Sequence, residues 1–345
     1  MIEIAGYTDK ARRKHNEDSY LVDENKQLYI VADGVGGAEA GEVASALACD
    51  VIADEVAAGN SLGDAILTAH SSVLEAAERG EGRQGMATTV VGFHFDELKY
   101  TVGWIGDSRA YLWDGRLNLL SRDHSYVEML YEQGHITLEE TNTHPQKNII
   151  TQAVGGRDMP TLEVGFNEGT LGPNQVLLLC SDGLTGELDE REILDFLDSG
   201  KEVSAIARGL VEAAVDAGGR DNITVIVIRG VADLPQQPAG TYPEVVRAFD
   251  PGTGSFSAIG KTPTRAETDE LVGDLNTAVM PSMSATEDAD IEVEAIPPIT
   301  AEPKITPSAN TKPKSKEGES FAWGSAFIGG LLGLITLAVL LTVFG

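Results

Sequence analysis

Cysteine is scarce in this chain, and the patterns of several common metal and nucleotide sites are missing. Only 2 cysteines occur among 345 residues. Cys49 and Cys180 each lie in an apolar run, which argues against a disulfide framework and predicts two core thiols in a reducing compartment. The 6 histidines form no i,i+4 pair, so a zinc site has little support. EF-hand and GxxxxGKS/T patterns are also absent, which excludes an EF-hand calcium sensor and a P-loop nucleotide hydrolase.

Positive charge is scarce as well. The chain has 25 Lys and Arg against 54 Asp and Glu, a formal net charge of -29. Nucleic acid is therefore not expected as a partner, because its phosphates would be repelled over most of the surface. The acidic balance fits hard-cation binding, a disordered acidic segment or simple solubility, and composition does not choose among them. Residues 1–13 lack the basic-then-apolar pattern of a secretory signal.

Three regions of the chain differ in composition. Residues 1–231 show dense apolar periodicity with regular glycine turns, which predicts a folded domain. Residues 232–320 are rich in Pro, Thr, Ser, Ala and acids and have no sustained apolar face. Such a segment cannot bury enough surface to offset its ordering entropy, so we expect a disordered linker.

Residues 321–345 contain no charged side chain. A run of roughly 20 apolar residues is the length of a membrane-spanning helix, and we expect one here. Lys312, Lys314 and Lys316 precede it, and positive charge marks the cytoplasmic side of a span. The sequence therefore predicts a single-pass membrane protein whose N-terminal domain lies in the cytoplasm.

The folded region mixes strands and helices. Alternating or continuous apolar runs predict strands at 28–32, 88–95, 100–105, 110–113, 176–180 and 223–228. Longer runs with helical period predict helices at 41–57, 62–78, 125–133, 189–198 and 203–217. Several strands follow one another across short gaps, as in hairpins, so we expect an α+β domain with layered antiparallel sheets.

Four aspartates occupy similar places, each beside a small residue where a buried strand meets a turn. They are Asp33, Asp107, Asp182 and Asp221. One such aspartate is ordinarily a turn or helix cap. Four at the ends of packed strands can converge, and converging carboxylates repel unless a cation neutralises them. Because oxygen ligands suit hard ions, Mg²⁺ or Mn²⁺ is the expected cation.

A second charged cluster, RRKHNED, lies at 12–18. It is either a solvated surface turn or an arginine that grips a phosphoryl group beside the carboxylates of Glu17 and Asp18. The residues alone leave both interpretations open.

Eight segments together carry a family resemblance: NEDSYL, VADGVGG, ATTVV, GDSRAYL, RDHSY, HPQKNIITQAVGG, CSDGL and GGRDNITVIVI. Their order resembles that of bacterial PPM (PP2C-type) protein serine/threonine phosphatases, over about residues 1–230. The resemblance implies a four-layer αββα sandwich in which helices flank two antiparallel sheets. It also implies two Mg²⁺ or Mn²⁺ ions, which activate a water for direct attack on the phosphorus.

The positions that match the family's active site follow from this resemblance. Arg13 would bind the phosphate, and Asp33 would bridge both ions. The Gly34 carbonyl would contact one of them, and Asp182 and Asp221 would be the remaining direct ligands.

Further positions match the surroundings of that site. Glu17 and Asp18 would hold metal-bound water. Asp107, together with Asp182, would form a third metal site. Residues 123–155 correspond to a mobile flap beside the site.

Two positions depart from the family pattern. The approach to the arginine reads TDKARR, one residue short and without its usual glycine, which leaves Arg12 as an alternative to Arg13. Val35 stands where eukaryotic relatives often carry a histidine proposed as general acid.

The function expected from these residues is hydrolysis of phosphoserine and phosphothreonine in proteins by a membrane-tethered enzyme. Its partners would be Ser/Thr kinases and their substrates. Two alternatives stay open: a catalytically silent module that binds phosphoproteins or a regulator, and a hydrolase of small phosphoesters.

Overall fold

The computed structural model describes residues 2–35, 40–157, 161–234 and 243–258. None of the helices in these ranges is long and apolar enough to cross a membrane. The span predicted at 321–345 lies outside the described residues, as does most of the linker predicted at 232–320.

Two antiparallel sheets form the centre of the domain. The seven-stranded sheet has the order β1-β11-β10-β7-β8-β12-β13. Its strands are β1 (Ile2–Asp9), β7 (Arg109–Trp113), β8 (Leu117–Leu119), β10 (Val176–Cys180), β11 (Ile223–Gly230), β12 (Arg247–Asp250) and β13 (Ser255–Ala258). The six-stranded sheet has the order β2-β3-β5-β6-β9, with β4 paired to β3. Its strands are β2 (Asp18–Asp23), β3 (Leu28–Val35), β4 (Ala87–Thr88), β5 (Val90–Asp96), β6 (Lys99–Ile105) and β9 (Gly165–Thr170).

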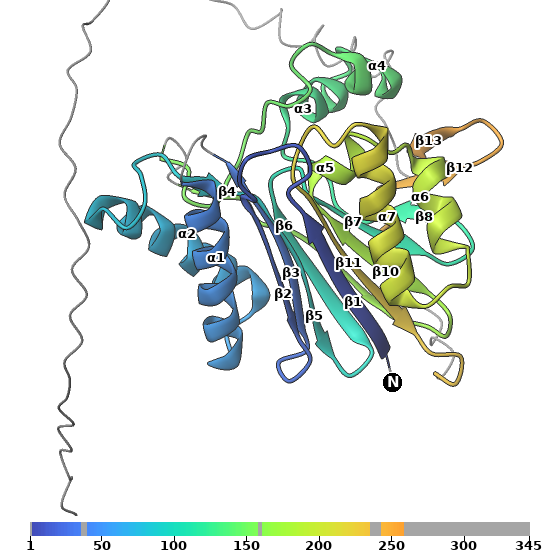
Figure 1. Cartoon of the computed structure of the whole chain (residues 1–345), viewed down its shortest axis with the longest axis horizontal. Helices are drawn as coiled ribbons and strands as arrows, with labels where there is room; N and C mark the ends of the chain where they lie inside the picture. The colour runs from blue at the N-terminus through green and yellow to red at the C-terminus, as the bar shows by residue number, and fades with distance from the viewer. Residues whose placement is uncertain (1, 36–39, 158–160, 235–242, 259–345) are drawn as a thin grey trace, which may run out of the picture. The chain divides into compact units, whose positions relative to one another are not determined.

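Helices cover the outer face of each sheet (Figure 1). Helices α1 (Gly41–Ala57) and α2 (Leu62–Arg79) pack on the six-stranded sheet. Helices α5 (Asp182–Thr185) and α7 (Val203–Ala217) pack on the seven-stranded sheet, and α6 (Glu190–Leu197) packs on α7. The short helices α3 (Tyr126–Glu132) and α4 (Leu138–Thr143) lie apart from these layers.

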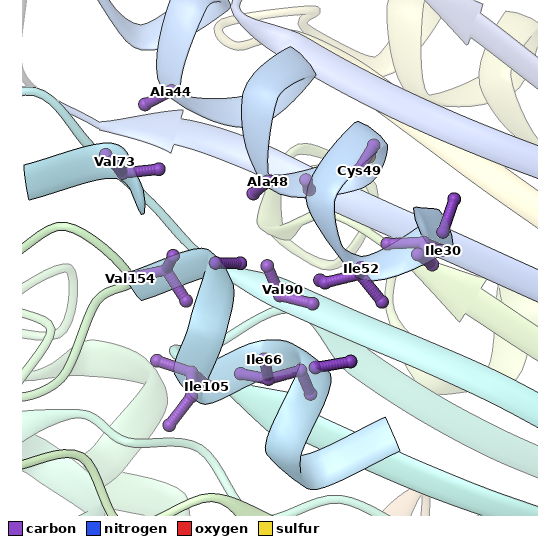
Figure 2. Packing of buried hydrophobic residues seen from close by; sticks show 14 of the residues in the cluster. Ile30, Ala44, Ala48, Cys49, Ile52, Ile66, Val73, Val90, Ile105 and Val154 are labelled. Atoms are coloured by element: carbon purple, nitrogen blue, oxygen red, sulfur yellow. The ribbon is translucent and has the colours of Figure 1, made fainter. Parts of the chain in front are cut away.

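Three apolar clusters hold the four layers together. Val31, Val91 and Ile226 belong to the cluster between the sheets, where the central strands are buried on both faces and therefore read as continuous apolar runs. A second cluster lies between the six-stranded sheet and α1 and α2, and Figure 2 shows Cys49 within it beside Ala48 and Ile52. The third lies under α5, α6 and α7. The predicted αββα sandwich is thus confirmed for the described residues, and both cysteines are buried and unpaired.

The predicted boundary at residue 231 is wrong, because β12 and β13 lie within the segment expected to be a disordered linker. Strand β12 pairs with β8, matching Arg247 with Leu119 and Ala248 with Asn118. Phe249 is 3% exposed and joins the cluster under the outer helices. Four-residue strands are too short to show a period, so pairing and burial, not local pattern, stabilise them.

Candidate active site

Five carboxyl groups approach one another at the edge where strand ends of both sheets meet; we call this the acidic edge. Asp18 and Asp33 are opposite partners on β2 and β3 of the six-stranded sheet. Asp182 begins α5 and is separated from the end of β10 by one residue, and Asp221 is separated from the start of β11 by one residue; both strands belong to the seven-stranded sheet. Asp107 lies in the turn that leads from β6 in one sheet to β7 in the other. The topology therefore brings together all four aspartates that the sequence singled out, with Asp18 as a fifth.

Two glycines allow the backbone segments to approach so closely. The Gly34 N–H donates to the Glu17 carbonyl at 3.1 Å, and a Cβ at Gly34 would lie 2.6 Å from that oxygen. A Cβ at Gly183 would lie 1.9 Å from the Asn222 carbonyl oxygen. The Asp-Gly pairs of the sequence are therefore positions where any side chain after the aspartate would push the site apart.

Hydroxyl groups fix the backbone of Asp33. Its carbonyl accepts from the Thr88 hydroxyl at 2.9 Å and from the Thr89 N–H at 2.8 Å. Its own N–H donates to Thr89 Oγ1 at 3.2 Å, and that hydroxyl shares a 2.7 Å hydrogen bond with Ser108. The segments ATTVV and GDS thus position the central aspartate, a role that the sequence alone did not reveal.

Asn222 holds the loop at 10–17 against the seven-stranded sheet. Its side-chain oxygen accepts from the Glu17 N–H at 2.8 Å, and its amide donates to the Lys10 and His15 carbonyls at 3.1 and 2.9 Å. The residue is 4% exposed. Because all three contacts lie more than 200 positions away, no local signal in the sequence could have identified this role.

Arg13 reaches the acidic edge from that loop. Its Nε and Nη2 donate to the two Asp221 oxygens at 2.9 and 2.8 Å, and its side chain is 51% exposed. The hydrogen bond to Asp221 raises the pKa of Arg13. Arg12 instead donates its backbone N–H to the Gly219 carbonyl. The geometry therefore favours Arg13 over Arg12 as the arginine of the site.

Negative charge accumulates at the acidic edge. Burial, more than any neighbour, raises the pKa of Asp18 to about 7. The pKa values of Asp33 and Asp107 lie well above the ordinary range, first through burial and then through the neighbouring carboxylates, and that of Asp182 is also raised. The two carboxyls also act on each other: Asp182 further raises the pKa of Asp33, and Asp33 opposes the rise in the pKa of Asp182.

The donor set fits a hard cation. Asp18 Oδ2 accepts from the Ser181 hydroxyl at 2.8 Å, whereas its Oδ1 is buried without a hydrogen-bond partner. A buried carboxylate oxygen without a partner is costly, and a cation or its water would satisfy it. In the part of the chain that the structure describes, no three His, Cys, Asp or Glu side chains are close enough to enclose an ion as they stand.

The predicted flap lies beside the acidic edge. Within residues 123–155 are α3 and α4, and the two helices pack on each other. A cavity of about 330 Å³ extends from Asp107 and Asp182 to Glu128 on α3 and Thr141 on α4. The flap therefore forms one wall of the space through which a substrate would approach the aspartates.

Comparison with known proteins identifies the family. The profile of the protein phosphatase 2C family matches residues 5–212. The chain belongs to this family.

Curated and solved relatives agree with the family match. The serine/threonine protein phosphatase PstP of Mycobacterium tuberculosis is 39% identical over 236 residues, which are 66% of this chain and 45% of that protein. The serine/threonine phosphatase stp of Listeria monocytogenes is 36% identical over 248 residues, 67% of this chain and 96% of the relative. A crystal structure of the PstP catalytic domain with two manganese ions superposes with a TM-score of 0.59 at 31% identity, covering 67% of this chain and 98% of that one.

The chain thus spans about half the length of the mycobacterial relative and nearly all of the listerial one. The family match and the names of these relatives agree with the enzyme class predicted from the sequence, a protein serine/threonine phosphatase dependent on Mg²⁺ or Mn²⁺, and the solved relative holds manganese.

Proposed function

We propose that this protein hydrolyses phosphoserine and phosphothreonine in other proteins and that two Mg²⁺ or Mn²⁺ ions bind at the acidic edge. One observation carries the proposal: carboxyl groups from both sheets meet there with raised pKa values, and the buried Asp18 has an oxygen without a hydrogen-bond partner. Such an accumulation of negative charge is unfavourable unless cations neutralise it.

The residues at the edge would divide the ligand roles. Asp33 would bridge the two ions, with the Gly34 carbonyl on one of them, and Asp182 and Asp221 would complete the direct ligands. When bound, the ions would supply Lewis-acid chemistry, making a water more acidic and neutralising charge on the phosphoryl oxygens. Backbone contacts from Thr88 and Thr89, and from Ser181 to Thr224, hold the strands that carry these groups.

The other acids would not be direct ligands of the two ions. Glu17 and Asp18 would hold waters on the ions, and Asp18 is fixed for this by the Ser181 hydroxyl. Asp107 and Asp182 both line the cavity beside the flap, where we place a third ion.

Arg13 would grip the phosphoryl group. Its guanidinium is held in plane by both Asp221 oxygens while half of the side chain stays exposed to an approaching phosphate. A fixed cation at this place stabilises negative charge that develops on the phosphoryl oxygens. Val35 pairs through its backbone with Ala87, and its side chain has no proton to donate. The leaving alcohol would therefore take its proton from a metal-bound water or have no dedicated acid.

We further propose that residues 321–345 anchor the protein in a membrane, with residues 1–231 in the cytoplasm. The support is in the sequence: an uncharged apolar segment that follows three lysines. Membrane-bound Ser/Thr kinases and their substrates are the partners that such a tether would bring to high local concentration.

The test is phosphate release from a phosphothreonine peptide by the full-length chain purified in detergent. We expect activity with Mn²⁺ or Mg²⁺, none with EDTA, and a loss of more than about a hundredfold in Asp33→Asn. Asp50→Asn, an exposed carboxylate on α1, is the matched control and should keep its activity. A folded wild-type protein that binds metal but releases no phosphate from phosphopeptides or small phosphoesters would instead be a binding module.

A further inference from the structure

A buried ion pair joins the flap to a strand beyond the matched family domain. Arg247 on β12 donates from Nη2 to both oxygens of Glu128 on α3, at 2.6 and 2.5 Å. Each side chain is 6% exposed, and the guanidinium also lies over the Tyr131 ring, 5.0 Å from its centre. Arg247 lies outside residues 5–212, where the family profile matches.

This pair involves one of the two buried residues of α3. The helix has seven residues, and its buried members are Val127 and Glu128. Both line the cavity that reaches Asp107 and Asp182, and Arg247 lines it too. The position of the α3 wall therefore depends on a side chain supplied from β12.

The strand that carries Arg247 is itself fixed to the sandwich. Buried Asn167 donates to the Glu244 carbonyl at 2.5 Å and accepts from the Glu244 N–H at 3.0 Å. The Val246 N–H donates to the Leu119 carbonyl at 2.9 Å. These contacts involve β9 and β8 and do not involve the flap, so β12 is a fixed support against which α3 can be held.

We propose that Arg247 is a positioning residue that fixes the α3 wall of the cavity and thereby determines how well phosphoprotein substrates bind. The inference rests on the proposed phosphatase function. A phosphopeptide has residues on both sides of its phosphorylated residue. With the phosphate at the acidic edge, the residues on one of these sides occupy the cavity between the edge and α3. A small aryl phosphate occupies only the acidic edge and does not require this wall.

The experiment compares full-length wild type with Arg247→Met, Arg247→Lys and Glu128→Gln. Substrates are a phosphothreonine peptide and p-nitrophenyl phosphate, each with Mn²⁺. In Arg247→Met and Glu128→Gln we expect the KM for the peptide to rise about tenfold while kcat and all constants for the aryl phosphate stay within about twofold. Arg247→Lys should restore part of the difference, because the cation is kept but the planar fork is lost.

The matched control is Arg191→Met. Arg191 lies on α6 and donates to the Pro251 carbonyl at 3.3 Å, in the turn between β12 and β13. It therefore contacts the segment that carries Arg247 but does not contact the flap through this bond. It should leave the peptide KM unchanged. An equal rise in peptide KM in this variant would overturn the inference, since any loosening of the segment would then suffice.

Hydrogen exchange supplies a readout that is independent of catalysis. Amides of α3 should exchange faster in Arg247→Met and Glu128→Gln than in wild type, while those of β10 and β11 keep their protection and show that the domain is folded. Unchanged exchange in α3 together with an unchanged peptide KM would refute the role of Arg247. If wild type hydrolyses neither substrate, the proposed function fails, and the exchange data still decide whether Arg247 holds the flap.

Discussion

Burial raises the pKa of carboxyl groups both at the acidic edge and at Glu128 of the flap, but the two regions differ in how far the chain pairs those groups. At the edge, the pKa values of Asp18, Asp33 and Asp182 are raised, and one Asp18 oxygen has no partner. At the flap, buried carboxylates are paired within the chain, as in the bond from Arg247 to Glu128. The difference indicates that the edge leaves its charge for an external cation, whereas the buried Glu128 of the flap has its cation within the chain, so that the flap contributes shape.

Asp123 extends this comparison to the base of the flap. Arg109 on β7 donates to it through Nε and Nη2, the latter at 2.7 Å, with side-chain exposures of 18% and 10%. A buried pair of this kind is costly to break, because the remaining charge loses a compensating partner. The flap is thus bound to the seven-stranded sheet at two points near its start, at Asp123 by Arg109 of β7 and at Glu128 by Arg247 of β12.

The largest effect is expected for Arg13, which donates to both oxygens of Asp221 at the acidic edge. Arg13→Ala should lower kcat for the phosphothreonine peptide about a hundredfold, because a fixed positive group beside the transferred phosphoryl is lost. Arg12→Ala is the control and should retain activity within about threefold. A larger loss in Arg12→Ala would show that the shortened TDKARR segment presents the other arginine.

Once metal is removed, the carboxyl groups of the acidic edge should make the thermal stability of the protein depend on pH. A carboxyl group has a pKa of about 4 in the unfolded chain. If folding raises this pKa, the group contributes its full stabilisation below about pH 4, and that contribution is lost as the pH rises through the pKa of the folded state. For Asp18 that window ends at about 7. The EDTA-treated protein should therefore lose thermal stability between about pH 5 and about pH 8 through these groups.

Adding Mn²⁺ should restore more stability at the higher pH, since ions compete with protons for the same oxygens. Scanning calorimetry at both pH values, with and without Mn²⁺, measures the gain in Tm. A gain of a few degrees that is larger at the lower pH would contradict the account.

The smallest effect is expected for an exposed ion pair on the flap. Arg122 and Glu132 are bonded, but their side chains are 49% and 44% exposed. Arg122→Met should change the free energy of unfolding by less than about 1 kcal/mol, because solvent screens such pairs. Urea titration of this variant beside Arg247→Met compares an exposed and a buried pair of the same flap. Equal destabilisation of the two variants would remove the distinction drawn between them.

Long apolar periods made much of the fold predictable. The predicted helices 41–57 and 203–217 and strand 176–180 coincide with α1, α7 and β10. The half-buried strands β1, β2 and β9 and the short β8 were not predicted, since partner strands and not local composition stabilise them. The same reason explains the strands β12 and β13 inside the predicted linker.

The residues of the site also differ in whether local sequence could identify them. The aspartates could be found because each follows or precedes an apolar run and stands beside a small residue. Ser181, whose hydroxyl binds Asp18 from 163 positions away, could not, because nothing in its local sequence distinguishes it from an ordinary helix cap. Arg247 was assigned to a linker, and only the tertiary structure shows its partner on the flap.

The account depends most directly on cations binding at the acidic edge. Equilibrium dialysis of the full-length protein against Mn²⁺, read by the loss of the free-ion signal in electron paramagnetic resonance, counts them. The account predicts at least two ions per chain in wild type and fewer in Asp33→Asn, with Asp50→Asn equal to wild type. Absence of Mn²⁺ binding to the folded wild-type protein, or the same count in Asp33→Asn, would contradict it.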